Sequence, residues 1–147
     1  MPIIGFWSAN PKESGQTLSI AALATYMAIE HNYKILLIDA TFDNDALERC
    51  FWKVNGTKDV AKMLNKGKMD ISSGAEGLVS AVASNKTTPE IITNYTRVVF
   101  KNRLDVLCGL KTKIPEEFTK SLMLYKDLVK TADKYYDLVF VDLEKTL

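Results

Sequence analysis

Residues 3–28 have the sequence IIGFWSANPKESGQTLSIAALATYMA, in which an apolar run gives way to a polar loop and then to a second apolar segment. The first run is a short aliphatic block without polar alternation, which is typical of a strand buried on both faces. We expect Trp7, at its end, to pack in the core. Residues 17–30 repeat apolar side chains at helical spacing and predict an amphipathic helix. Because a loop between a buried strand and a helix N-terminus presents unpaired backbone N–H groups, this stretch predicts an anion-binding site.

Further apolar runs predict three more strands, at residues 34–39, 103–110 and 136–143. Because a strand, a helix and a second strand follow one another within residues 3–39, we expect a βαβ unit with parallel strands. Helices are expected at 45–54, at 57–65, from Pro115 onward, and as one short helix within the irregular segment 67–90. The sequence therefore predicts an α/β fold with a doubly wound, mostly parallel sheet, formed by residues 1–147 as a single domain.

The composition is that of an ordinary globular domain, with 147 residues, 47% of them hydrophobic and 25% charged. A net charge of +1 gives no overall electrostatic signal for nucleic acid or an anionic membrane as partner. Cys50, Cys108 and His31 lack the spacing of metal ligands, so we expect structural roles for them. No apolar run reaches the roughly 18 residues of a membrane-spanning helix, and the N-terminus lacks the features of a signal peptide. These patterns indicate a cytoplasmic, reduced protein.

The polar loop NPKESGQT, residues 10–17, resembles a phosphate-binding loop in which one position has changed. In such a P-loop a lysine reaches the β- and γ-phosphates, and the next Ser or Thr hydroxyl holds Mg²⁺. Here the hydroxyl residue is present as Thr17, but the lysine position holds a glutamine, whose amide donates hydrogen bonds without neutralising charge. The expected phosphate-binding residues are Lys12, Ser14, Gly15, Gln16 and Thr17.

Beyond the loop, several segments follow the order seen in one superfamily. These are GFWS, the Gly15 and Thr17 of the loop, LSIAALATYMA, KILLIDA, LDVLCGL and YDLVFVDL. Together they resemble the deviant Walker A P-loop ATPases, which include MinD, ParA and the pilus-assembly proteins TadZ and CpaE. The resemblance extends over nearly the whole chain and implies a P-loop NTPase-like fold.

The resemblance also implies a ligand and a set of site residues. The ligand is ATP or ADP with Mg²⁺. Thr17, Asp39 and Asp142 would lie at the metal, and Asp39 and Asp43 would serve the reaction, with Asp45 as an alternative to Asp43 for orienting the attacking water.

Three departures from the family pattern bear on activity. The Walker lysine is replaced by Gln16, the family's second lysine would fall on Pro11, and a second carboxylate common in the family is replaced by Thr41. Because phosphoryl transfer depends on charge stabilisation, loss of the lysine should lower hydrolysis by orders of magnitude. We therefore expect nucleotide binding to be weak or absent, closest to the TadZ- and CpaE-like pseudo-ATPases.

These features leave three functional hypotheses open. The first is a positioning or assembly factor, for example of a pilus, secretion or partition system, that forms a homodimer and binds a protein of a polar or membrane-associated assembly, so that its own membrane association is indirect. The second is a slow Mg²⁺-dependent ATPase that uses Lys12. The third is a structural domain without nucleotide, in which Asp39 and Asp142 only end strands and Ser14 or Thr17 caps the helix.

The length of the chain adds one expectation. Family members continue well past the strand that matches residues 136–143, so we expect a sheet truncated after this Walker B strand and a chain that is an N-terminal fragment or a shortened relative. A strand left at the edge of such a sheet would favour dimerisation.

Overall fold

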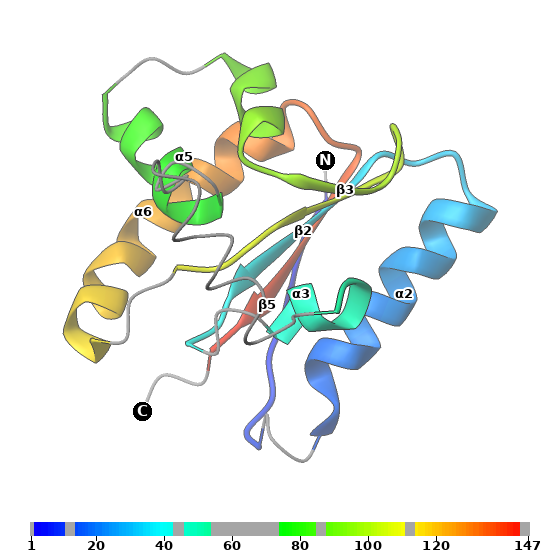
Figure 1. Cartoon of the computed structure of the whole chain (residues 1–147), viewed down its shortest axis with the longest axis horizontal. Helices are drawn as coiled ribbons and strands as arrows, with labels where there is room; N and C mark the ends of the chain where they lie inside the picture. Colours follow the sequence, from blue (N-terminus) through cyan, green and yellow to red (C-terminus); the bar gives the residue numbers. More distant parts are fainter. Residues whose placement is uncertain are drawn as a thin grey trace.

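A computed structural model describes residues 2–10, 14–42, 46–53, 74–84, 88–110 and 114–144 (Figure 1). Its elements in chain order are β1 (Ile3–Phe6), α2 (Gln16–Glu30), β2 (Ile35–Ala40), α3 (Ala46–Phe51), α5 (Gly74–Ala83), the 3₁₀ helix η1 (Pro89–Asn94), β3 (Arg97–Phe100), β4 (Leu104–Leu107), α6 (Pro115–Asp133) and β5 (Leu138–Leu143). The helix expected at 57–65 lies outside the described residues.

The strands form a five-stranded sheet in the order β1-β5-β2-β4-β3. The pairs β1–β5, β5–β2 and β2–β4 are parallel, and β3 runs antiparallel to β4 at one edge. The prediction of a mostly parallel sheet is confirmed. The sequence did not indicate β3. Among the described residues it pairs with β4 alone and is mostly exposed, so its pattern lacks the buried block of β2, β4 and β5.

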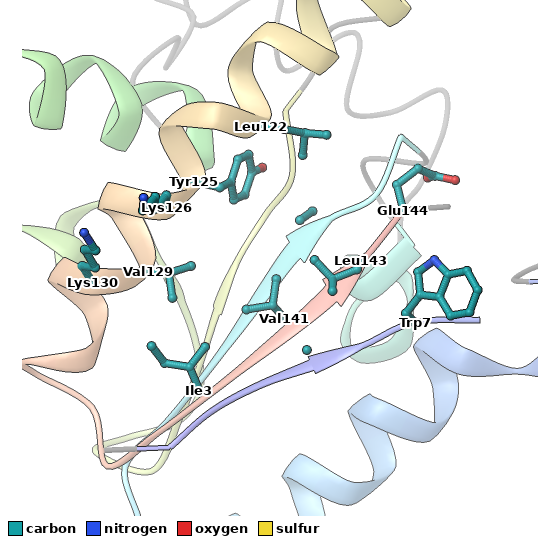
Figure 2. A pocket seen from close by; sticks show the side chains of 12 residues that line it. Ile3, Trp7, Leu122, Tyr125, Lys126, Val129, Lys130, Val141, Leu143 and Glu144 are labelled. Carbon is teal, nitrogen blue, oxygen red and sulfur yellow. The ribbon is translucent and has the colours of Figure 1, made fainter. Parts of the chain in front are cut away.

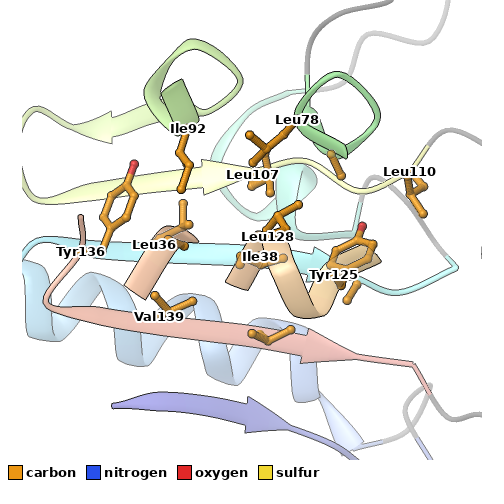
Figure 3. Packing of buried hydrophobic residues seen from close by; sticks show 14 of the residues in the cluster. Leu36, Ile38, Leu78, Ile92, Leu107, Leu110, Tyr125, Leu128, Tyr136 and Val139 are labelled. Carbon is orange, nitrogen blue, oxygen red and sulfur yellow. The ribbon is translucent and has the colours of Figure 1, made fainter. Parts of the chain in front are cut away.

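Helices cover both faces of the sheet, which confirms the doubly wound arrangement. Helices α2 and α3 lie on one face, and α5 and α6 lie on the other (Figure 1). Because successive strand residues point to opposite faces, Leu36 and Ile38 of β2 pack under α6 while Leu37 packs under α2. Figure 3 shows the α6 side of this core, where Leu128 and Tyr136 lie against the side chains of β2.

Strand β1 departs from the expectation of a strand buried on both faces. Within the described residues it pairs only with β5, and Ile3 and Ile4 are 45% and 41% exposed. Trp7, expected in the core, is 60% exposed just beyond its end. Apolar composition predicts a strand, but only the presence of a neighbouring element determines whether that strand is covered. The edge at β1 is therefore an apolar surface.

The expected helices at 17–30 and from Pro115 onward are present as α2 and α6. The one short helix expected within residues 67–90 is present as α5. In the described part of the chain, no helix combines the length and the apolar character that would let it cross a membrane.

Candidate functional site

The candidate site lies where β1, β2 and β5 end beside the N-terminus of α2. Because all three strands are parallel, their carboxyl ends meet at one edge of the sheet, where α/β folds bind ligands. The register places Asp142 of β5 between Phe6 of β1 and Asp39 of β2. Two carboxylates that are far apart in the sequence are thereby brought onto neighbouring strands.

A left-handed glycine forms the entry to α2. Gly15 has φ 65° and ψ 25°, a conformation that costs glycine little and other residues more. Gly15 is itself the N-cap residue, and no side chain forms a cap hydrogen bond there. The alternative in which Ser14 or Thr17 caps the helix is therefore wrong. Ser14 is exposed, and its backbone N–H donates to Asn10 O at 3.1 Å.

Gln16, at the position of the P-loop lysine, turns toward the sheet. Its side-chain Nε2 shares its two hydrogens among three acceptors, Phe6 O at 3.0 Å, Leu143 O at 3.1 Å and Asp142 Oδ1 at 2.5 Å. The residue is only 9% exposed, and its Oε1 has no hydrogen-bond partner among the described residues. The amide thus joins the start of α2 to the ends of β1 and β5.

Asp142 is fully buried and is bonded through both carboxylate oxygens. Oδ1 accepts from Gln16, and Oδ2 accepts from Thr17 Oγ1 at 2.6 Å. Since a hydroxyl has one proton and two lone pairs, Thr17 still has acceptor capacity on its oxygen after this bond. Each carboxylate oxygen of Asp142 thus accepts a hydrogen bond from a neutral donor of the chain itself.

Asp39 is also fully buried, but its carboxylate is directed elsewhere. Oδ1 accepts from Thr41 N at 3.0 Å and from Thr41 Oγ1 at 2.6 Å, and Oδ2 lies 3.4 Å from the donating Leu47 N. The pKa of Asp39 is raised from 3.8 to about 7, chiefly by burial and also by the nearby Asp142 carboxylate, against the lowering effect of the hydrogen bonds from Thr41 and Leu47. Asp39 thus shapes the turn after β2 and meets the start of α3.

The sequence pattern did not indicate this role for Thr41, which appeared only as a missing carboxylate. The signal was available, because an Asp followed two residues later by a donor is the spacing of an Asx turn. The interaction of Gln16 with Asp142 had no comparable signal, since the two residues are 126 positions apart.

The structure brings some of the expected site residues together, and others lie outside the described residues. Gln16, Thr17 and Asp142 are in direct contact, and Asp39 lies on the adjacent strand. Lys12 and Asp43 lie outside the described residues, as does Asp45. Over the described ranges, no cluster of three or more His, Cys, Asp or Glu side chains is arranged to hold a metal ion.

The raised pKa of Asp39 predicts a pH dependence of stability. The folded protein binds the Asp39 proton more tightly than the unfolded chain does. The stabilisation of the fold by this protonation is therefore complete below pH 3.8 and is lost as the pH rises through about 7. We expect the Asp39→Asn variant, which carries no charge, to lose less stability over this range, by at least about 1 kcal/mol. Urea unfolding of both proteins at about pH 5 and about pH 8 measures the difference. Equal losses in the two proteins would show that Asp39 does not titrate in this window.

No protein-family model matches this sequence, and no curated protein matches it. Solved structures do match. A ParA family ATPase from Chlorobium tepidum aligns with 98% of this chain at 19% identity and a TM-score of 0.62. The kinase domain of the Escherichia coli tyrosine kinase ETK aligns with 97% at 23% identity and a TM-score of 0.61. A plasmid partition protein of Borrelia burgdorferi bound to AMPPNP aligns with 98% at 18% identity and a TM-score of 0.56.

These similarities confirm the expected resemblance at the level of the fold. The matches extend over nearly all of this chain, but this chain spans 52%, 46% and 52% of the three solved chains. The chain thus corresponds to about half the length of each of these proteins.

Proposed function

We propose that this chain, which has the fold of the ParA-like P-loop ATPases, is a positioning or assembly factor that binds ATP weakly and hydrolyses it slowly or not at all. The observation that carries the proposal is the orientation of Gln16. At the position where an active P-loop has a lysine, the side chain is neutral, and its only donor group is directed at Phe6, Asp142 and Leu143 instead of the loop.

The fit of a nucleotide to these residues is partial. The N-terminus of α2, entered through the left-handed Gly15, offers backbone N–H groups and a positive helix end to a phosphate. The Thr17 oxygen would hold Mg²⁺, which supplies charge neutralisation to the phosphates, and Asp142 would orient Thr17 through their hydrogen bond. No described side chain supplies the lysine's positive charge at position 16. Binding without efficient turnover is the expected consequence.

The proposed biological role follows the proteins that share the fold. They include a ParA family ATPase, plasmid partition proteins and McdA. We propose a homodimer, formed by one P-loop-like domain per chain, that binds a protein of a polar or membrane-associated assembly in the cytoplasm, with membrane association only through that partner. A partition, pilus or secretion system is the class of assembly that this role fits.

One contact favours a slow ATPase as the second candidate. Thr17 and Asp142 keep the hydroxyl–carboxylate pair that positions Mg²⁺ in a P-loop, at 2.6 Å. In this hypothesis Lys12 supplies the missing positive charge, and Asp39 with Asp43 serves the attacking water.

Calorimetric titration with ATP, with and without Mg²⁺, together with a phosphate-release assay, separates these functions. We expect dissociation constants above about 100 μM for the wild-type protein, and no turnover, because the phosphate charge is not neutralised by a lysine. Any Mg²⁺ dependence of binding should disappear in Thr17→Ala and persist in Thr17→Ser, which keeps the hydroxyl.

Each outcome supports a different function. Sustained Mg²⁺-dependent turnover that is lost in Lys12→Ala would establish the second candidate, an active ATPase in which Lys12 supplies the missing charge, in place of a factor with weak or absent hydrolysis. Absence of ATP binding at millimolar concentration would leave only the structural domain. Mg²⁺ dependence that survives in Thr17→Ala would remove the metal role proposed for Thr17.

A further inference from the structure

The side of helix α2 that faces away from the sheet is apolar. Ala24 is fully buried against the sheet, and because successive helix residues turn by about 100°, Ala22 and Tyr26 lie almost opposite it. Leu18 and Ile29 lie on the same outer side. Leu18, Tyr26 and Ile29 are 67%, 59% and 64% exposed, and Ala22 is exposed as well. Because surface helices usually turn a polar face outward, these four residues, the outer stripe, indicate a contact surface.

The outer stripe is distinct from the open edge at β1. Gln16 reaches Phe6 of β1 through its amide, which marks the flank of α2 that faces this edge. Leu23 lies two turns after Gln16 on the same flank. A helix packed on further strands beyond β1 would lie beside α2 in the same layer and would cover Leu23, whereas the outer stripe points away from the sheet. An apolar groove of about 670 Å³ between β1 and α6 is also separate from the stripe, because α6 covers the other face of the sheet (Figure 2).

The outer stripe is complementary to itself when a second copy runs in the opposite direction. A two-fold axis beside the middle of α2 places Leu18 of one copy level with Ile29 of the other, and Ala22 level with Tyr26. Each end of the contact then joins two aliphatic side chains. At the centre, the large ring of Tyr26 lies over the small Ala22, so that a protruding side chain meets a recess in the facing helix. An isologous interface requires this kind of self-complementarity.

The charge on α2 favours the same arrangement. The helix has one charged residue, Glu30, which is its last residue, and its first turn contains no acidic side chain. The dipole of the helix disfavours a carboxylate at the C-terminal end and favours one at the N-terminal end. In the antiparallel pair, Glu30 of each copy lies beside the first turn of the other copy's α2. A charge that is unfavourable in the single chain thus becomes favourable in the pair.

We propose that the outer stripe of α2 packs antiparallel against the outer stripe of a second copy of this chain. This inference rests on the homodimer of the proposed function and names the surface that forms it. A single pair of short helices buries less area than the roughly 1,200–2,000 Å² of stable interfaces, so the dimer is weak and dissociates at micromolar concentrations. Gln16 and Asp142 face the sheet, on the other side of α2 from the stripe, so ATP binding is measured separately from dimerisation.

The test is the mass of the wild-type protein by light scattering over a dilution series without nucleotide. We expect the mass to rise from that of the monomer toward twice that value as the concentration increases. Tyr26→Lys removes the central ring and places an ammonium group from each copy near the two-fold axis, so it should weaken dimerisation about tenfold or more. Met123→Lys adds the same charge at an 80% exposed position of α6, on the other face of the sheet, and should leave the dissociation constant unchanged.

An exchange of side-chain size tests the register. Tyr26→Ala should weaken the dimer, and adding Ala22→Tyr to it should restore dimerisation, since the two positions meet across the two-fold axis. Far-ultraviolet circular dichroism at concentrations below the dissociation constant establishes that each variant is folded as a monomer. A dimer that tolerates Tyr26→Lys, or a double exchange that fails to restore it, would overturn this interface and leave the proposed homodimer standing. A monomeric wild-type protein at all concentrations would overturn both, whatever its affinity for ATP.

Discussion

Replacing Gln16 by lysine is expected to increase the affinity for Mg²⁺-ATP by about ten- to one hundredfold. The amide now makes neutral hydrogen bonds to the strand ends, whereas an ammonium group would add a charge-assisted bond to a phosphate, worth about 1.5–3 kcal/mol. A lysine also has the length to reach from the first turn of α2 toward the loop. Calorimetric titration of the variant and the wild-type protein under the same conditions measures the change.

The control for Gln16→Lys is Ala22→Lys, which adds the same charge to an exposed position farther along α2. This variant should bind ATP as the wild-type protein does. Asp142 offers the new ammonium group an alternative partner, because its Oδ1 already accepts from position 16. Unchanged ATP affinity in Gln16→Lys would mean that the ammonium group remains with Asp142, and it would count against a phosphate-binding loop.

Phe140→Ala is expected to lower the free energy of unfolding by about 3–5 kcal/mol, the cost of removing a large aromatic side chain from a core. Phe140 is 1% exposed in β5 and packs edge-to-face against Phe6, with ring centroids 5.4 Å apart. Its removal would leave a cavity between α2 and the sheet. Phe6 of the edge strand β1 would also lose its ring contact with Phe140. Urea unfolding followed by circular dichroism gives the difference.

Leu18→Ala is the matched control for Phe140→Ala. Leu18 is 67% exposed on α2, and alanine has a high helix propensity. Leu18→Ala should therefore change the free energy of unfolding by less than about 0.5 kcal/mol. A loss of less than about 1 kcal/mol for Phe140→Ala would show that the surrounding side chains close the cavity.

The strands of the parallel sheet could be predicted because each is specified locally. Residues 35–40 and 138–143 are aliphatic blocks whose burial follows from helices on both faces. Strand β3 lies at an edge with mostly exposed residues, so its sequence carries no such block. Edge position also explains Trp7, whose exposure depends on what lies beside β1 and not on its own hydrophobicity.

The residues of the candidate site could be predicted from the sequence, but their contacts could be predicted only in part. Gly15 and Thr17 follow from the loop pattern, and Asp39 and Asp142 follow from the ends of parallel strands. The orientation of Gln16 does not follow, since it depends on three acceptors contributed by β1 and β5. The hydrogen bond from Thr17 to Asp142 is likewise a long-range contact that no local pattern encodes.

The pairing of β1 with β5 has a consequence for the order of folding. The register joins Ile3 to Val139, so the first strand gains this partner only after residue 139 has been synthesised. Closing so long a loop costs entropy before any contact offsets it, and such non-local pairing slows folding. The nascent chain therefore carries an unpaired apolar strand until β5 has left the ribosome, and during this interval chaperone binding or premature association would compete with the native sheet.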